Sequence, residues 1–272
     1  MNQLLFSLSD FLYCRKHKYY YFSLSVSSFI AENMIFLKFI VEGNIGCGKS
    51  SLISGINSRR KEIISAIYET SNLPVQIYCV KEPLHEWEMA LTQYYSTFSN
   101  EDFLRLQLII YTSLFAREKK LFEELQNSKE RLAICFLERD MNSGENFFIN
   151  NDLLPFQDSK ILTEFSKILT SNSPFHMQGA KKYIFIESDP LTCFSRIATR
   201  QTLYDSKIPL AFLESLNYRY QSFFARTKNI PLSSHVLSNI HKTPPCVQDF
   251  IVPIILGALR EIDNAPCTLK HS

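Results

Sequence analysis

The residues best suited to chemistry form one glycine-rich segment in the first fifth of the chain. Its sequence is Gly43-Asn44-Ile45-Gly46-Cys47-Gly48-Lys49-Ser50, followed by Ser51. The segment comes directly after an apolar run and directly before a helical pattern, which is the context of a phosphate-binding P-loop. The amides of such a turn and the positive end of the following helix bind nucleotide phosphates. We therefore predict that Lys49 bridges the β- and γ-phosphates and that Ser50 ligates Mg²⁺.

Charged residues follow two other apolar runs. Glu82 comes shortly after the run 75–80, and Glu138 and Arg139 come directly after the run 132–137. Because the carboxyl ends of parallel strands meet at one edge of a sheet, we expect these three side chains beside the P-loop. A carboxylate in that place can act as a general base, and a guanidinium can stabilise developing negative charge.

The elements that must position these residues alternate short apolar runs with longer helical patterns, which is typical of a parallel sheet. We predict strands at 35–41, 75–80, 132–137, 183–186 and 232–237. We predict helices at 49–68, 100–126, 159–170, 190–203, 209–227 and 247–262. The expected fold is α/β, with a five-stranded parallel sheet flanked by helices.

Length and composition fit one enzyme-sized domain. The chain has 272 residues, 46% of them hydrophobic, and a formal net charge of +2, which argues against bulk attraction to nucleic acid. We place the domain at 34–264, with a tail at 265–272 and an extension at 1–33 that is flexible or carries a targeting signal. Within the extension, the aromatic and serine-rich stretch 19–31 is too short and polar for a membrane span. We expect a cytoplasmic protein, or a mitochondrial one if the extension is a targeting segment.

From about residue 39 to 224 the sequence resembles the deoxyribonucleoside kinase family, which includes deoxycytidine, deoxyguanosine and mitochondrial thymidine kinases. The resemblance rests on four ordered motifs: Glu42-Gly43-Asn44-Ile45; Glu82-Pro83 with Trp87; Glu138-Arg139 with Ser143 and Phe148; and Cys193, Arg196 and Arg200 followed by Ile208-Pro209-Leu210 and Leu213-Glu214. It implies a P-loop kinase fold with an arginine-bearing lid, ATP and Mg²⁺ as cofactors, and phosphorylation of the 5′-hydroxyl of a deoxyribonucleoside. It also implies a homodimer, although the same helical patterns suit the core of a monomer.

The resemblance assigns catalytic roles to charged residues. Glu82 would accept the proton of the 5′-hydroxyl, and Arg139 would hold that oxygen and Glu82 in line with the γ-phosphorus. Glu138 would help to position Mg²⁺. Arg196 and Arg200 would close over the phosphates and offset the charge that develops during transfer.

The resemblance also describes the base site. Gln107 would hydrogen-bond the base edge, while Trp87 and Phe148 would pack against the flat faces of the base. Leu114 and Gly144 stand where deoxycytidine kinase has an arginine and an aspartate. Because neither residue is charged and both leave room for a methyl group, we predict a preference for thymidine or for pyrimidines broadly.

The sugar site and the lid depart slightly from the family pattern. Tyr95, or its neighbour Tyr94, would bind the 3′-hydroxyl together with Asp205. The family usually has a glutamate where Asp205 stands, and a further arginine where this chain has Thr202. Loss of an arginine that acts on the transition state would slow turnover.

Two acidic replacements leave alternatives open. Asp140 and Glu145 stand where the family has a serine and an arginine. One alternative is a nucleoside monophosphate kinase of the thymidylate type, although that acceptor needs additional cations. The other is a catalytically weakened nucleotide-binding module that acts through a partner.

Overall fold

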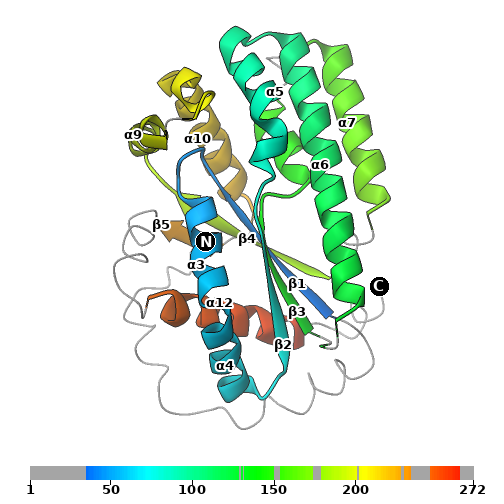
Figure 1. Ribbon diagram of the computed structural model, residues 1–272, viewed down its shortest axis with the longest axis vertical. Coiled ribbons are helices and arrows are strands. Elements are labelled where there is room, and N and C mark those ends of the chain that lie inside the picture. The colour runs from blue at the N-terminus through cyan, green and yellow to red at the C-terminus, as the bar shows by residue number, and fades with distance from the viewer. Residues whose placement is uncertain are drawn as a thin grey trace.

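The computed structural model describes residues 35–128, 130, 132–149, 154–173, 179–200, 202–227, 230–233 and 246–263. Their strands are β1 (Ile35–Gly43), β2 (Val75–Val80), β3 (Leu132–Glu138), β4 (Ala180–Glu187) and β5 (Ile230–Ser233). They form one sheet in the order β2-β3-β1-β4-β5, and every neighbouring pair is parallel (Figure 1). The α/β prediction with a parallel sheet is confirmed. Since β1 is central, the P-loop begins in the middle of the sheet's carboxyl edge.

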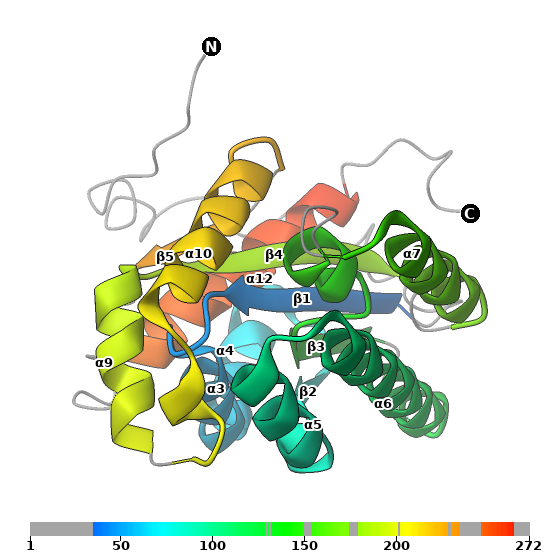
Figure 2. The same ribbon diagram turned by 90° about the horizontal axis from the view of Figure 1, so that it is seen from above.

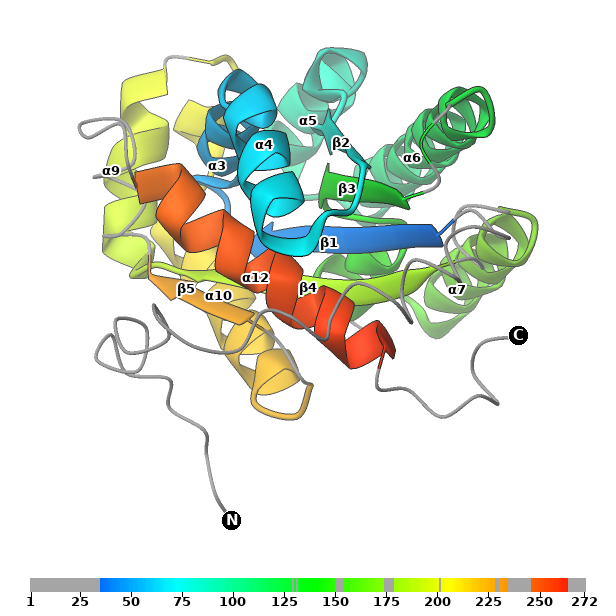
Figure 3. The same ribbon diagram turned by 90° about the horizontal axis from the view of Figure 1, so that it is seen from below.

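Helices cover both faces of the sheet. They are α3 (Lys49–Ser58), α4 (Arg60–Ser71), α5 (Leu84–Thr97), α6 (Asn100–Gln126), α7 (Phe156–Ser171), α9 (Pro190–Arg200), α10 (Leu210–Phe224) and α12 (Cys246–Asp263). Helices α5, α6 and α7 lie side by side (Figure 2), and α12 crosses beneath the sheet in contact with α3 and α4 (Figure 3). Two short turns, the π-helical Gly144–Phe148 and the 3₁₀-helical Asp205–Lys207, lie near the carboxyl edge. Among the described residues, no helix is both long and apolar enough to cross a membrane.

The two faces of β1 show why the strand is central. Phe36 and Ile40 pack on the α6 face with Leu121 and Leu125, whereas Leu37, Phe39 and Val41 join the opposite core with residues of α3, α4 and α12. All five β1 side chains are at most 4% exposed. A strand with apolar residues on both faces is typical of a parallel sheet covered by helices on each side.

Three predictions made from the sequence need correction: one helix is divided, one helix was missed and one strand is shifted. The helix predicted at 49–68 is two helices, because Arg59 adopts φ −110° and interrupts it. Apolar spacing could not show this break, since Ile56 and Ile63 keep one buried face across it. The prediction had no helix at α5, which ends in a run of tyrosine, serine and threonine residues with modest helix propensity.

The last strand also starts earlier than expected. β5 occupies Ile230–Ser233 and overlaps the predicted segment 232–237 at only two residues. Residues 234–237, the extension 1–33 and the tail 265–272 lie outside the described residues.

Candidate functional site: a phosphate loop beside a carboxylate–guanidinium pair

The P-loop has the tight backbone that its glycines predict. Gly43 and Gly46 have φ of 145° and 84°, and a Cβ on either would lie 2.7 Å from a backbone oxygen, that of Ile186 or Cys193. Only glycine fits such positions without strain. Lys49 is buried, and its Nζ donates to the carbonyl oxygen of Gly43 at 3.0 Å. The lysine ammonium thus lies inside the curve of the loop.

One pocket adjoins the P-loop, and most of the predicted site residues line it. On its phosphate side these residues are Ile45, Gly46, Gly48, Lys49, Ser50, Glu82, Glu138, Arg139 and Arg200. On its nucleoside side they are Trp87, Tyr94, Tyr95, Gln107, Leu114, Gly144, Phe148 and Asp205. The predicted residues outside this lining are Gly43, Asn44, Cys47, Ser51 and Arg196. Five separate chain segments therefore converge on one concave site.

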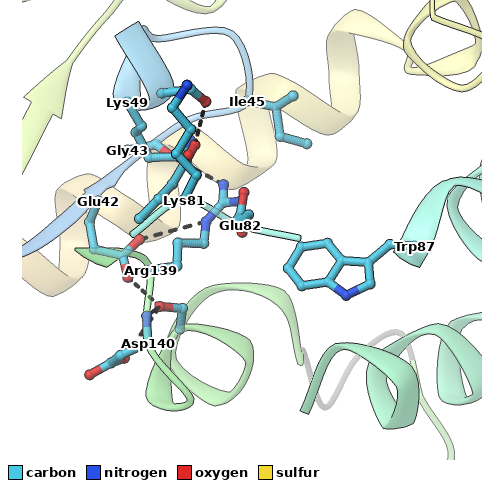
Figure 4. Close-up of polar contacts among 12 residues, drawn as sticks. Glu42, Gly43, Ile45, Lys49, Lys81, Glu82, Trp87, Arg139 and Asp140 are labelled. Atoms are coloured by element: carbon cyan, nitrogen blue, oxygen red, sulfur yellow. Dashed lines mark hydrogen bonds and ion pairs between the residues drawn. The ribbon is translucent and has the colours of Figure 1, made fainter. Parts of the chain in front are cut away.

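The centre of the site is an ion pair between Glu82 and Arg139. The Nη1 of Arg139 donates to Oε1 of Glu82 at 2.7 Å, and the two side chains are 9% and 5% exposed. Glu82 follows β2 and Arg139 follows β3, so neighbouring parallel strands deliver the two groups to one edge. Arg139 adopts φ 56°, a left-handed conformation that is uncommon outside glycine. Its guanidinium lies between Glu82 and a second carboxylate, Glu42 (Figure 4).

Further groups hold the Arg139 guanidinium. Its Nε lies 3.8 Å from Oε2 of Glu42 and 3.4 Å from the hydroxyl of Tyr220, and its carbon lies 4.9 Å from the centre of the Phe148 ring. Burial disfavours its charge, but Glu82, Tyr220 and Glu42 more than compensate and raise the pKa of Arg139 well above its usual value. Arg139 is therefore a fixed cation at the floor of the pocket.

Glu42 is the buried end of this network. Burial raises the pKa of the Glu42 carboxyl to about 7, although Arg139 and the Ser143 hydroxyl oppose the shift. Ser143 donates to Oε1 of Glu42, and Tyr220 donates to Oε2 at 3.2 Å. Neither Glu42 nor Tyr220 has a predicted role. Glu42 directly precedes the P-loop glycine, so its position was a usable signal; Tyr220, 178 residues away, offered none.

Oxygen ligands suited to Mg²⁺ meet at the start of α3. The hydroxyl of Ser50 donates to Oε1 of Glu138 at 2.7 Å, next to the P-loop. Burial, followed by the charge of Glu82, raises the pKa of Glu138. Mg²⁺ is commonly bound by one or two protein oxygens together with substrate phosphates, and this pair fits that pattern.

At the far end of the pocket, two buried polar side chains offer free hydrogen-bonding atoms. Gln107 and Asp205 are 1% and 3% exposed. Within the described part of the chain, Oε1 of Gln107 and both carboxylate oxygens of Asp205 have no hydrogen-bond partner. Buried polar atoms are normally paired, so unpaired atoms that face a cavity point to a polar ligand.

Aromatic rings enclose this end. Trp87 is buried, and its Nε1 donates to the Ser113 hydroxyl at 2.6 Å, which fixes the indole orientation. Tyr94 and Tyr95 both line the pocket. Burial raises the pKa of both hydroxyls, and Asp205 is close enough to add to the shift for Tyr95. Tyr95 is therefore the tyrosine that shares its surroundings with Asp205.

Gly144 lies in a place where no side chain fits. A Cβ on it would be 2.7 Å from the hydroxyl oxygen of Tyr111 and 3.2 Å from Oε1 of Gln107. Leu114, on the same helix as Gln107, contributes another uncharged wall and is 2% exposed. The base end of the pocket therefore has no charged group at either position.

The lid arginines differ in their contacts. Arg196 donates from Nη1 to the carbonyl oxygen of Cys47 at 3.3 Å, so it touches the P-loop from outside the pocket lining. Arg200 is exposed and lines the pocket. Thr202, where a further arginine is usual, accepts from the amide of Asp205 at 3.2 Å and stabilises the turn that presents this carboxylate.

The two acidic replacements, Asp140 and Glu145, lie outside the pocket lining. Asp140 is buried and pairs with Nζ of Lys181 at 3.1 Å, and it also accepts from the amide of Asn142 at 3.0 Å. Glu145 is exposed and does not line the pocket. Neither carboxylate places net negative charge beside the P-loop.

Similarity to known proteins agrees with this geometry. The chain is 23% identical over 194 residues to a protein of Invertebrate iridescent virus 3 named "Putative kinase protein 029R", and the aligned part covers 70% of this chain and 83% of that protein. Residues 39–243, well over half of the chain, match the family described as deoxynucleoside kinase. The members of this family are phosphotransferases that use ATP, generally with Mg²⁺. This chain belongs to the deoxynucleoside kinase family.

Proposed function

We propose that the protein transfers the γ-phosphate of ATP to the 5′-hydroxyl of a deoxyribonucleoside. The observation that carries this proposal is the Glu82–Arg139 pair, which lies at 2.7 Å in the same pocket as Lys49. When a hydroxyl group accepts a phosphoryl group, it needs a base within hydrogen-bond reach of its proton and a cation beside its oxygen. Family membership supports the same reaction.

The phosphate side would work mainly by positioning and charge. Lys49 and the P-loop amides would hold the β- and γ-phosphates, while Ser50 and Glu138 would hold Mg²⁺, which neutralises charge on the transferred group. Glu82 would accept the hydroxyl proton, and Arg139 would keep the oxygen in line. Arg196 and Arg200 would bring positive charge over the phosphates from the lid. Closure of such a lid excludes water and limits ATP hydrolysis.

The nucleoside side supports a deoxyribonucleoside acceptor. Asp205 and Tyr95 would bind the 3′-hydroxyl, since the unpaired carboxylate is a strong acceptor for that group. Gln107 would hydrogen-bond the edge of the base through its amide, and the base would lie between the rings of Trp87 and Phe148. These roles use polar atoms that the protein itself leaves free for a ligand.

The uncharged base end supports a preference for thymidine or for pyrimidines broadly. Leu114 gives this end an apolar wall, and Gly144 adds no charged group to it, since the Tyr111 hydroxyl leaves no room for a side chain there. Steady-state rates with thymidine, deoxycytidine, deoxyadenosine and deoxyguanosine test the preference, and a clear purine preference would contradict it.

A nucleoside monophosphate acceptor fits the pocket less well. Its lining carries three carboxylates, Glu82, Glu138 and Asp205, against Lys49 and two arginines, of which Arg139 is already paired with Glu82. Lys49 and Arg200 are assigned to the phosphates of ATP, so the described lining offers no further unpaired cation for a phosphate on the acceptor. A weakened binding module was suggested by Asp140, Glu145 and Thr202. Lys181 neutralises the charge of Asp140, Glu145 lies outside the pocket lining, and Thr202 stabilises the turn that presents Asp205.

Radiolabelled transfer from [γ-³²P]ATP separates the three functions in one experiment. Labelled thymidine monophosphate from thymidine is expected. Label transferred only to thymidine monophosphate would show a monophosphate kinase, and label in neither product would show a binding module. Each of the last two results would overturn the proposal.

Assembly as a homodimer through α6 and α7 is also proposed. Ile161 and Ile168 stand one heptad apart on α7 and are both exposed. Exposed apolar side chains on one helix face suit a helix–helix interface. Analytical ultracentrifugation should give twice the chain mass, and an Ile161→Glu, Ile168→Glu variant should give the monomer mass; a monomeric wild-type protein would refute this.

A further inference from the structure

An arginine behind the site, Arg117 of α6, binds the main chain of both catalytic strand ends. Its Nη2 donates to the carbonyl oxygen of Arg139 at 2.7 Å, and its Nη1 donates to that of Glu138 at 2.9 Å. Nη1 also lies 3.4 Å from the carbonyl oxygen of Lys81, the residue before Glu82. One guanidinium thus spans the ends of β2 and β3.

The backbone that Arg117 binds is an unusual one. Arg139 has φ 56°, and such conformations persist in non-glycine residues only where the surroundings enforce them. On one side, the amide of Arg139 donates to the carbonyl oxygen of Val41 at 3.2 Å. On the other side, Arg117 takes the carbonyl oxygen of Arg139. The left-handed turn is therefore bound at both ends, and it directs the Arg139 side chain toward Glu82.

Arg117 does not reach the pocket itself. It is half-buried and absent from the pocket lining, so it has no contact with a bound acceptor. Burial lowers its pKa, and the surrounding carboxylates of Glu118, Glu82, Asp140 and Glu138 oppose that shift. Among the described residues, its terminal nitrogens nevertheless bind backbone carbonyls and no carboxylate. By donating these hydrogen bonds to main-chain oxygens, the Arg117 side chain holds the backbone at the ends of β2 and β3 in place.

We infer that Arg117 is the positioning residue of the reaction: by binding the carbonyls of Lys81, Glu138 and Arg139, it sets the backbone that brings Glu82 and Arg139 together. This inference rests on the proposed function only where turnover is its readout. A planar guanidinium with two terminal nitrogens can bind two neighbouring carbonyls at once, whereas a lysine ammonium is a single point donor. Arg117→Lys should therefore keep the positive charge but lose the simultaneous hydrogen bonds to neighbouring carbonyl oxygens.

Kinetics of the variants Arg117→Lys and Arg117→Met provide the first test. A displacement of about 1 Å at a reacting group can cost about 10²-fold in rate, so we expect kcat to fall by about 10- to 100-fold. The KM values for ATP and nucleoside should stay within about threefold, because Arg117 touches neither. Lys119→Met, an exposed change two residues along the same helix, is the matched control and should leave kcat unchanged. A variant with reduced thermal stability but wild-type kcat per folded molecule would overturn the inference.

A double-mutant cycle separates positioning from mere stability. If Arg117 acts through Glu82, then Arg117→Lys should cost little further rate in a Glu82→Gln background, so the two effects should not add. Full additivity would contradict the inference.

A crystal structure of Arg117→Lys supplies a readout that needs no activity. Arg139 should leave the left-handed region, and the distance between its Nη1 and Oε1 of Glu82 should exceed the 2.7 Å of the wild type. An unchanged Arg139 φ and ion pair would refute the inference. A wild-type protein that phosphorylates no deoxyribonucleoside would instead overturn the proposed function, and this structural comparison would still decide the role of Arg117.

Discussion

Replacing Glu82 by glutamine tests the centre of the site with the smallest change of shape. Glutamine keeps one oxygen that can accept from Arg139, but it cannot take up a proton at neutral pH. Arg139 is also held by Glu42 at 3.8 Å and by Tyr220 at 3.4 Å, so its guanidinium should stay in place. The change therefore isolates the proton acceptor from the rest of the network.

Because only the proton acceptor is removed, the expected loss of kcat equals the contribution of general-base assistance. General-base assistance contributes about 10²- to 10⁴-fold, which corresponds to about 3 to 5 kcal/mol of activation free energy. We expect kcat of Glu82→Gln to fall within that range. The ATP dissociation constant should stay within about threefold of wild type, because in the proposed mechanism Lys49 and the P-loop amides hold the phosphates without Glu82.

Steady-state transfer to thymidine and calorimetric titration with ATP measure the two quantities. Glu86→Gln, an exposed change on the neighbouring turn, serves as the control and should leave both at wild-type values. An unchanged kcat for Glu82→Gln would refute the assignment of the base. A tenfold or larger loss of ATP affinity would show that the ion pair supports the phosphate site instead.

Three further outcomes follow from buried groups. Asp205→Asn should raise the KM for thymidine about 10- to 100-fold, as expected for loss of a charged hydrogen bond. It should leave the binding of 3′-deoxythymidine unchanged, because that nucleoside lacks the 3′-hydroxyl. Equal effects on both nucleosides would contradict the proposed role of Asp205. Glu42→Gln should change the pH dependence of the free energy of unfolding. Because burial raises the folded pKa of Glu42 to about 7, the stability that this group gives the wild type is full below about pH 4.5 and is lost as pH rises to about 7. The resulting difference of about 3 kcal/mol between the two proteins should be resolved by denaturant titrations from pH 5 to pH 8. Parallel curves for the two proteins would contradict the raised pKa. Gly144→Val should destabilise the fold by about 1 to 3 kcal/mol and raise the thymidine KM, because its Cβ would lie 2.7 Å from the Tyr111 hydroxyl oxygen; a wild-type melting temperature would show that the site relaxes freely.

Much of the phosphate site could be predicted because its chemistry is local. The P-loop is a turn whose glycines, lysine and serine act within eight consecutive residues, and the flanking strand and helix are visible as apolar patterns. Glu82 and Arg139 could also be placed together, since parallel strands with right-handed crossovers end at the same edge. The sheet's class and the positions of β1, β2 and β3 followed from the same alternation.

The remaining features depend on contacts between distant segments. The partner of Asp140 is Lys181, 41 residues further along the chain, and it converts an acidic replacement into a buried ion pair. The break at Arg59 and the helix α5 arise from packing that local propensity does not encode. The roles of Glu42 and Tyr220 needed the folded chain to bring β1 and α10 together.

The sequence by itself determined that this chain carries a P-loop on a parallel sheet, because the residues that form the loop are neighbours in the chain. Only the tertiary structure decided how Arg139 is oriented. Its left-handed backbone, its carboxylate partners and the contacts of Arg117 come from four separate segments. The geometry of a buried ion pair is set by every group that surrounds it, and those groups become neighbours only when the chain folds.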